Sequence, residues 1–325
     1  MVSKSFYGQL FLTIKSIFKC SILLFMGWCC FLQNATAALY PMPSYGNDII
    51  GHAFVTRVRS YDSVTKIRHR YDVSLNELVE ANPDTNFYRL RVGQKIVIPA
   101  EYILPKYRRG IVINIPELRL FYFTPDGRYV YTFPVGLGRE NWRTPTAAAK
   151  VIYKEAYPSW HPPDTIREYY LEKTGEVLPD VVPPGPKNPL GKYALYLSKN
   201  GYLIHGTNIP DSVGTFISSG CMRLLDDAIE TLYANVGVGT EVHIVHHQVK
   251  VGWYGDILYL ESHTPIDSYQ EYNQDFGPPE LNSMGTENAI YQATAGRPAY
   301  VNWNLVSQAV RNHGGIPEPI GKRFS

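Results

Sequence analysis

Cysteine is scarce in this sequence, and its distribution limits what the protein can be. Of the four cysteines among 325 residues, Cys20, Cys29 and Cys30 lie within the first 37 residues, so Cys221 is the only thiol beyond them. One thiol cannot form an internal disulfide, and a structural zinc site uses several thiolates. A single leftover thiol is therefore a candidate for an intermolecular bond or for reactivity.

Charge is also sparse. Charged residues make up 18% of the chain and hydrophobic residues 45%, which indicates a globular protein with a buried core. The formal net charge is +2, and no basic tract gives any indication of a nucleic-acid partner. Tyrosine, by contrast, is abundant at 25 residues, and its flat amphipathic ring suits contact with sugars.

Residues 1–37 have the pattern of an export signal. Lys4, Lys15 and Lys19 precede an apolar run from Ser21 to Leu32, and the small residues around Ala37 fit a signal-peptidase site. We expect cleavage near Ala37 and a periplasmic protein whose only membrane contact is through this signal. An uncleaved anchor is the alternative, although the run is short for a span of roughly 20 residues.

Residues 38–52 are expected to form a linker to a small module at residues 53–100. Alternation and helical spacing predict a strand in "VTRVRS", helices in "DSVTKIRHRY" and "LNELVEAN", and a strand in "QKIVIP". This order, with "YDVSLNELVEANP" and "LRVGQKIVIP", resembles a LysM module, although Tyr61 stands where the family usually has glycine. The resemblance implies binding of N-acetylglucosamine-containing glycan such as peptidoglycan; a spacer domain is the alternative.

Residues 106–247 are predicted to be mainly β and sandwich-like, with strands in "GIVINI", "LRLFYF", "YVYTFPVG", "KVIYKEAY", "YALYL", "YLIHG" and "EVHIVHH". A proline-rich insertion at 158–192 contains a predicted helix, "DTIREYYLEKTG", with Asp164 as its N-cap and Gly175 just beyond its end. Long insertions of this kind are often lids. Within it, Trp160, Tyr169 and Tyr170 are either substrate contacts or packing residues. Residues 248–325 are expected to add a hairpin and a helical extension.

The segment "HGTNIPDSVGTFISSGCMRL" carries the candidate chemistry. His205 ends a predicted strand, and Cys221 follows sixteen residues later, just before a predicted helix. A thiol with its reference pKa of about 8.5 is mostly protonated near neutrality, so a nucleophilic cysteine needs a base or a positive environment. If the two positions lie side by side in the fold, the imidazole can accept the thiol proton and return it to a leaving amine.

Neighbouring residues have possible supporting roles. Gly220 permits a tight turn whose N–H groups, with that of Cys221, could stabilise an oxyanion. Arg223 can donate to loop carbonyls or to a substrate carboxylate. Gly206, Ser218 and Ser219 are candidate substrate contacts, and for Ser219 the alternative role is to cap the loop.

These residues resemble a known signature. His205-Gly206 together with Ser218 through Leu224 is similar to the signature of the YkuD-type L,D-transpeptidase catalytic domain. The segments "GIVINIPELRLFYF", "PVGLGRENWRTPT" and "VVPPGPKNPLGKYAL" resemble the branch with an N-terminal LysM module, which includes enzymes that attach murein lipoprotein. Many members have histidine in place of Ser219 and asparagine in place of Arg223.

The resemblance implies a reaction. Cys221 would attack the carbonyl that joins meso-diaminopimelate to the terminal D-alanine of a tetrapeptide stem, forming a thioester and releasing D-alanine. An amine from a second stem or from a murein lipoprotein lysine would accept the acyl group, giving a 3→3 cross-link or an anchor; water would make the enzyme a carboxypeptidase. The resemblance also implies acylation of Cys221 by carbapenems, and it calls for no cofactor.

Two other interpretations stay open. The protein could be a non-enzymatic wall-binding protein with a degenerate catalytic scaffold. A metal at His243, His246 and His247 is a further possibility, but their alternation with apolar residues fits a strand end, so no metal site is predicted.

Overall fold

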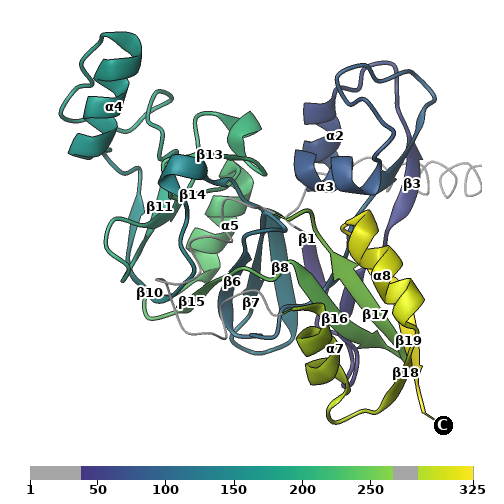
Figure 1. Cartoon of the computed structure of the whole chain (residues 1–325). Helices are drawn as coiled ribbons and strands as arrows, with labels where there is room; N and C mark the ends of the chain where they lie inside the picture. Colours follow the sequence, from purple (N-terminus) through teal and green to yellow (C-terminus); the bar gives the residue numbers. More distant parts are fainter. Residues whose placement is uncertain (1–37, 266–284, 325) are drawn as a thin grey trace, which may run out of the picture. The chain divides into compact units, whose positions relative to one another are not determined.

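A computed structural model describes residues 38–265 and 285–324 (Figure 1). The predicted export signal lies outside these residues. Within the described ranges, none of the helices has both the length and the apolar character needed to cross a bilayer. The fold is mainly β, and a small βααβ module precedes the main β domain, which confirms the predicted fold class.

The main domain is built on one nine-stranded sheet. Its strand order is β1-β8-β7-β6-β15-β10-β11-β12-β14, where the strands are β1 (Ala38–Pro41), β6 (Gly110–Asn114), β7 (Arg119–Phe123), β8 (Tyr129–Pro134), β10 (Ala147–Ala156), β11 (Tyr193–Leu197), β12 (Leu203–His205), β14 (Met222–Arg223) and β15 (Glu241–Val245). Most neighbours are antiparallel, but β15 pairs with β6 and β14 pairs with β12 in parallel. A parallel pair requires a crossover connection, and the connection from β12 to β14 carries the candidate motif.

Both faces of the central strands are covered, which explains why their sequences are almost continuously apolar. Ile111 and Ile113 of β6 face one core together with Ile229 and Leu232 of α5 (Asp226–Asn235). Val112, from the same strand, faces a second core on the opposite side. Successive side chains of a strand point to opposite faces. When both faces are buried, nearly every position is therefore apolar.

The N-terminal module (residues 54–99) comprises β3 (Phe54–Arg57), α2 (Val64–Tyr71), α3 (Leu75–Ala81) and β4 (Lys95–Ile98). Its two strands pair in antiparallel register, and its helices begin at side-chain caps. The Ser63 hydroxyl accepts from the Lys66 N–H, and Ser74 with Glu77 forms a reciprocal capping box. These are the start signals that the sequence offers for helices in this module.

The insertion between β10 and β11 contains α4 (Asp164–Thr174), none of whose residues is buried. Gly175 caps its C-terminus with φ +74°, as predicted. The predicted N-cap is wrong: Pro163 occupies that position and Asp164 is the first helical residue, without a side-chain cap. Proline is well suited to a helix start because the N–H it lacks has no intrahelical partner there.

Short elements complete the architecture. Residues 38–52, expected as a linker, supply β1 and also β2 (Ile49–Gly51), which pairs with β5 (Glu101–Ile103). β9 (Leu137–Gly138) pairs with β13 (Phe216–Ser218), and single 3₁₀ turns occupy η1 (Glu140–Trp142) and η2 (Pro210–Ser212). The C-terminal region contains the expected hairpin, β16 (Val249–Tyr254) and β17 (Ile257–Ser262), and the expected helix, α8 (Trp303–Asn312), together with α7 (Thr286–Thr294), β18 (Ala299–Val301) and β19 (Glu318–Arg323). These strands form a sheet in the order β16-β17-β19-β18.

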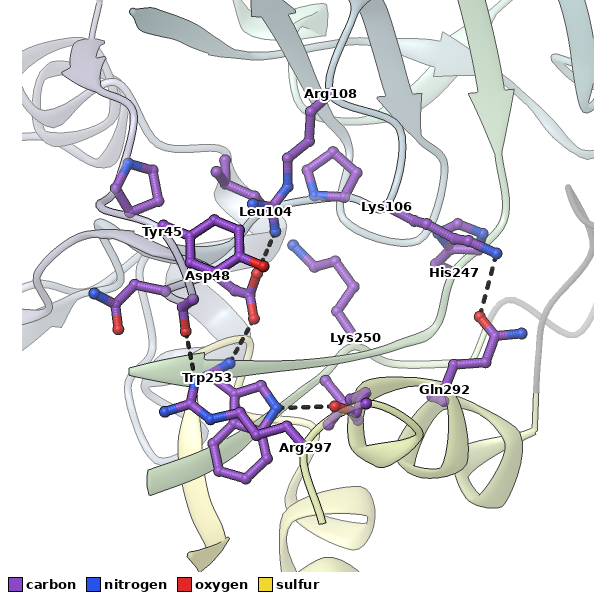
Figure 2. A pocket seen from close by; sticks show the side chains of 18 of the residues that line it. Tyr45, Asp48, Leu104, Lys106, Arg108, His247, Lys250, Trp253, Gln292 and Arg297 are labelled. Atoms are coloured by element: carbon purple, nitrogen blue, oxygen red, sulfur yellow. Dashed lines mark hydrogen bonds and ion pairs between the residues drawn. The ribbon is translucent and has the colours of Figure 1, made fainter. Parts of the chain in front are cut away.

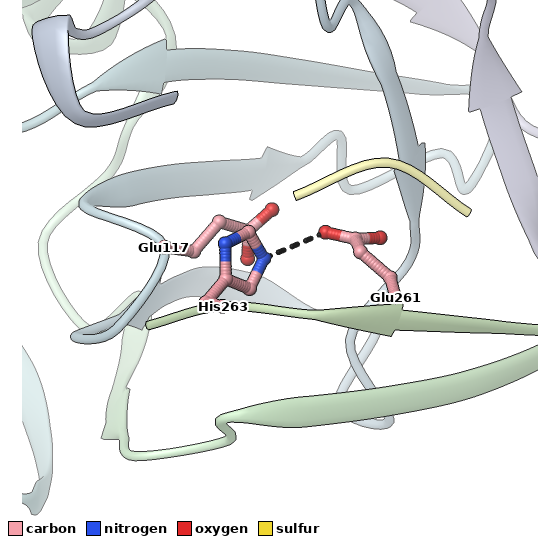
Figure 3. A group of neighbouring side chains, drawn as sticks. All are labelled: Glu117, Glu261 and His263. Atoms are coloured by element: carbon pink, nitrogen blue, oxygen red, sulfur yellow. Dashed lines mark hydrogen bonds and ion pairs between the residues drawn. The ribbon is translucent and has the colours of Figure 1, made fainter. Parts of the chain in front are cut away.

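A buried ionic network joins this C-terminal sheet to the rest of the protein (Figure 3). The Lys250 ammonium lies 2.8 Å from carboxylate oxygens of both Glu117 and Glu261. The His263 ring bonds to Glu261 at 2.9 Å and to Glu80 of α3 at 3.0 Å. Glu117, Glu261 and His263 are close enough together to suit a metal ion, but the ammonium of Lys250 already pairs with both carboxylates. We therefore interpret the group as a closed set of ion pairs.

Candidate active site

His205 ends β12, and Cys221 directly precedes β14, which pairs with β12 in parallel. In the register of β12 and β14, Ile204 is opposite Met222 and His205 is opposite Arg223. Ile204 and Met222 are both fully buried in the core. Because successive side chains point to opposite faces, His205 and Arg223 share the other face. The crossover thus brings the segment that carries Cys221 alongside the strand that carries His205.

The imidazole of His205 is held as a neutral base. Its Nδ1 lies 2.6 Å from the Gly206 carbonyl oxygen, and since a carbonyl can only accept, the proton is on Nδ1 and the lone pair is on Nε2. The ring is buried, and burial together with the nearby Arg223 charge lowers the pKa of His205 to about 4. Above that pH the ring can accept a proton.

Cys221 is a free and partly exposed thiol. Its Sγ lies 3.6 Å from the carbonyl oxygen of Gly201. Desolvation raises the pKa of Cys221, while a backbone contact at Leu203 and the Arg223 charge act in the opposite direction. The resting site therefore contains a neutral thiol beside a neutral imidazole, and not a preformed thiolate–imidazolium pair.

A compact turn positions the cysteine. Gly220 has φ +107°, and a Cβ there would lie 3.3 Å from the Tyr202 ring. The Gly220 carbonyl accepts from Thr144 Oγ1 at 2.7 Å. The Ser218 hydroxyl accepts from the Gly220 N–H at 3.1 Å and donates to the Cys221 carbonyl at 2.7 Å. Ser218 is thus buried and engaged in bracing the turn, and the N–H of Gly220 is directed at Ser218.

Thr144 is a residue that sequence reasoning missed. Besides donating to Gly220, its hydroxyl accepts from the Gly138 N–H at 3.0 Å, so it ties the turn before Cys221 to β9. The available signal was its place in "PVGLGRENWRTPT", a segment similar to the family pattern but without a charged or nucleophilic group to mark this threonine.

Gly206 and Arg223, the next two predicted site residues, have different surroundings. Gly206 is buried against the 190–191 turn: a Cβ there would lie 3.3 Å from both Gly191 Cα and Ile229 Cγ2. Its position therefore serves close packing, and its carbonyl holds His205. Arg223 differs, since its buried Nε has no hydrogen-bond partner among residues 38–265 and 285–324. Burial and the charge of Arg139 lower the pKa of Arg223.

An open cleft of about 860 Å³ borders the turn that carries Cys221, although neither Cys221 nor His205 is among its lining residues. It is lined by the turn at 199–202, by Ser219, by residues 140–146 and by Pro163, Thr165 and Ile166 at the start of the insertion. Gly201, whose carbonyl contacts the sulfur, belongs to this lining. Ser219 is therefore the predicted substrate contact that faces the cleft.

The insertion helix α4 packs against one wall of this cleft through aromatic contacts. Trp142 and Tyr169 lie 5.5 Å apart between ring centroids, and the Arg139 guanidinium stacks on both rings at 4.8 and 4.4 Å. Trp160 instead pairs through its backbone with Val182 at the base of the insertion. Of the aromatic residues considered in the lid, Tyr169 thus lies nearest to the cleft wall.

A second cavity, of about 920 Å³, is lined by several cations (Figure 2). Arg108 forms an ion pair with Asp48, Lys250 bonds to Glu117 and Glu261, and Arg297 donates to two backbone carbonyls. Its positive charge is therefore largely engaged within the protein, and the thiol–imidazole pair is not in its lining.

Comparisons with known proteins agree with this geometry. Residues 108–244 match the L,D-transpeptidase catalytic domain (YkuD), and residues 56–99 match the LysM domain. The chain is 39% identical to the probable L,D-transpeptidase ErfK/SrfK of Escherichia coli K12 over 75% of this chain and 80% of that protein. It is 38% identical to the probable L,D-transpeptidase YcfS of the same strain over 77% of this chain and 80% of that protein. With the probable L,D-transpeptidase YbiS of that strain, identity is 32% over 94% and 97%.

Proposed function

Because the chain belongs to the L,D-transpeptidase family, we propose that it transfers the acyl group of a peptidoglycan stem peptide by way of a thioester on Cys221. The observation that carries this proposal is the parallel pairing of β12 with β14, in which His205 pairs with Arg223, two residues after Cys221. The cleft supports it, because its lining includes Ser219 and Gly201, whose carbonyl contacts the Cys221 sulfur.

The first step is acylation. His205 Nε2 takes the thiol proton as Sγ attacks the carbonyl carbon of the bond between meso-diaminopimelate and D-alanine. A carbon–sulfur bond forms, the carbon–nitrogen bond breaks, and the imidazolium gives its proton to the departing D-alanine amine. Since the resting pair is neutral, proton transfer accompanies attack, and the Nδ1–H bond to Gly206 keeps the ring oriented throughout.

The second step is deacylation by an amine. The neutral imidazole takes a proton from the acceptor amine, whose nitrogen attacks the thioester, and the sulfur leaves and regains a proton. A second stem as acceptor gives a 3→3 cross-link, and a lysine of a murein lipoprotein gives an anchored protein. Water would give hydrolysis instead.

The positive charge of Arg223 and Arg139 suits a stem peptide that carries negative charge. Arg223 offers its Nε to a substrate carboxylate, and Arg139 adds positive charge nearby. With the Gly220 N–H bonded to Ser218, the Cys221 N–H is the proposed backbone donor to the oxyanion. The N-terminal module would hold glycan strands, consistent with a periplasmic site of action.

Mass spectrometry tests this function. Purified protein is incubated with disaccharide-tetrapeptide, with and without an acceptor peptide ending in lysine. We expect loss of D-alanine and a joined product that both disappear in Cys221→Ala. Loss of D-alanine without a joined product would replace transfer by hydrolysis, and absence of any thiol-dependent product would leave only glycan binding.

A further inference from the structure

The segment that joins His205 to Cys221 contacts the N-terminal module directly. Thr65 Oγ1, at the start of α2, donates to Asp211 at 3.0 Å. One turn further along α2, the buried guanidinium of Arg68 donates to the backbone carbonyl of Val213, which is also buried. A glycan-binding module that acts only as a tether has no need of such contacts.

Gly214 shows how closely the two parts approach. It has φ +69°, and a Cβ at this position would lie only 2.4 Å from Ser74 Cβ and 2.9 Å from Ser74 Cα. Ser74 is the N-cap of α3, so the start of that helix lies directly on the loop backbone. Any side chain at residue 214 would push the loop and the module apart.

A second connection runs through a buried salt bridge. Glu77 of α3 accepts from Arg119 Nε at 2.7 Å and from Arg119 Nη2 at 3.0 Å. Arg119 is on β7, where it is opposite Pro134 at the end of β8. The module thus also holds the point from which the chain continues into residues 135–138.

The two connections meet beside the nucleophile. The Leu137 N–H donates to the Thr215 carbonyl at 2.9 Å, and a Cβ on Gly136 would lie 2.5 Å from the Ser212 carbonyl oxygen. Gly136 in turn exchanges two backbone hydrogen bonds with Arg223, at 2.8 and 2.9 Å. Arg223 is two residues after Cys221 and opposite His205.

We infer that the N-terminal module is a positioning part of the active site: Arg68, Ser74 and Glu77 fix the loop at 211–215 and residues 134–138, and these fix β14 against β12. The inference deepens the proposed function and rests on it. Positioning of this kind matters because a displacement of about 1 Å at a reacting group can reduce a rate by up to about a hundredfold. Undocking the module would therefore impair chemistry even on a substrate without glycan.

Two matched pairs of variants of the full chain test the inference. Arg68→Gln removes the donor to Val213, whereas Arg70→Gln, on the same helix, breaks an ion pair with Asp62 and a contact with the Tyr71 ring, both inside the module. Gly214→Ala forces a Cβ against Ser74, whereas Gly127→Ala replaces a glycine with the same φ of +69° and no neighbour within 4 Å. Each pair changes the same chemical group, and only the first member disturbs the docked contact.

Two readouts separate positioning from stability and from substrate choice. One is kcat and KM for D-alanine release from a glycan-free stem tetrapeptide; the other is the rate of Cys221 alkylation by iodoacetamide, which needs no substrate. Both are measured below the thermal midpoint of each variant. We expect Arg68→Gln and Gly214→Ala to lower kcat about tenfold or more, with little change in KM, and to alter the alkylation rate. The controls should stay within about twofold of wild type.

The outcomes are decisive in either direction. Wild-type-like kcat and alkylation in both docking variants would overturn the inference and make the module a tether. If wild type releases no D-alanine, the proposed function fails, yet alkylation still reports whether the module positions the thiol. Should a docking variant lose its folded circular-dichroism spectrum, Thr65→Val removes one exposed hydrogen bond to Asp211 and should alter alkylation in the same direction.

Discussion

Replacing Glu77 by glutamine should strongly destabilise the protein. Glu77 and Arg119 are both essentially inaccessible, with side-chain exposures of 2% and 0%. Among the described residues, Glu77 is the carboxylate that forms an ion pair with Arg119, and Arg119 also stacks on the Tyr102 ring at 4.3 Å. The neutral amide would leave a buried guanidinium without its counter-charge.

The magnitude follows from burial. Removing one partner of a buried salt bridge typically costs about 3–5 kcal/mol, because the remaining charge stays desolvated. Glutamine is accepted at the N3 position of a capping box, so the start of α3 should survive and the cost should reflect the lost charge. The Asp72 and Thr132 oxygens continue to accept from Arg119 and compensate only in part.

Equilibrium unfolding in urea, followed by tryptophan fluorescence, measures the loss. Glu77→Gln should lower the unfolding free energy by about 3–5 kcal/mol, and Glu77→Gln combined with Arg119→Met should regain part of it, since no charge then remains buried. Asp126→Asn, which breaks an exposed pair with Arg128, is the control and should leave stability essentially unchanged. A loss below about 1 kcal/mol for Glu77→Gln would refute the reasoning, because exposed pairs already contribute that much.

Four further predictions concern pH and the insertion at residues 158–192. Two buried carboxylates raise the folded-state pKa of His263 to about 10, above an unfolded value of about 6.5, so the stabilisation is complete below the lower value and is lost as pH rises through the higher one. Urea midpoints should fall across that window in wild type and less in His263→Gln; parallel curves would contradict this. Alkylation of Cys221 should keep rising into the alkaline range, because burial raises its pKa, and a plateau near neutrality would instead indicate an ion pair with His205. As pH is lowered, kcat/KM should fall only near pH 4, where His205 becomes protonated. Asn188→Ala removes a buried amide that donates to the carbonyls of residues 158, 182 and 183 at the base of the lid, so KM for the tetrapeptide should rise severalfold while kcat changes less; an unchanged KM would separate the lid from substrate binding.

Patterns among residues close together in the sequence predicted the individual helices and strands. The helices α2 and α3 followed from the spacing of their apolar residues, and Ser63 and Ser74, which that prediction did not use, cap their first turns. The strands of the main sheet followed from short apolar runs bounded by turns. The error at Asp164 has the same origin: both aspartate and a preceding proline are start signals, and only the backbone conformation decides between them.

Long-range features could not be predicted in this way. The parallel pairing of β6 with β15 joins residues about 130 positions apart, and no local pattern specifies it. Lys250, within a predicted hairpin, gave no sign of burial, because lysine is normally exposed. Its burial becomes favourable because Glu261 faces it from the other strand of the hairpin and Glu117 comes from a distant part of the chain.

The candidate site depends both on local sequence motifs and on long-range contacts. The sequence identifies His205 and Cys221, but the strand that carries the cysteine, β14, has only two residues and lies at the end of the sheet order. Two backbone pairs with β12 cannot by themselves hold a thiol in reach of an imidazole with the accuracy that proton transfer demands. The additional constraint comes from Thr144 on the Gly220 carbonyl and from Gly136 on the Arg223 backbone. Because the partners of Gly136 lead back to the N-terminal module, the motif depends on parts of the chain that contain no catalytic residue.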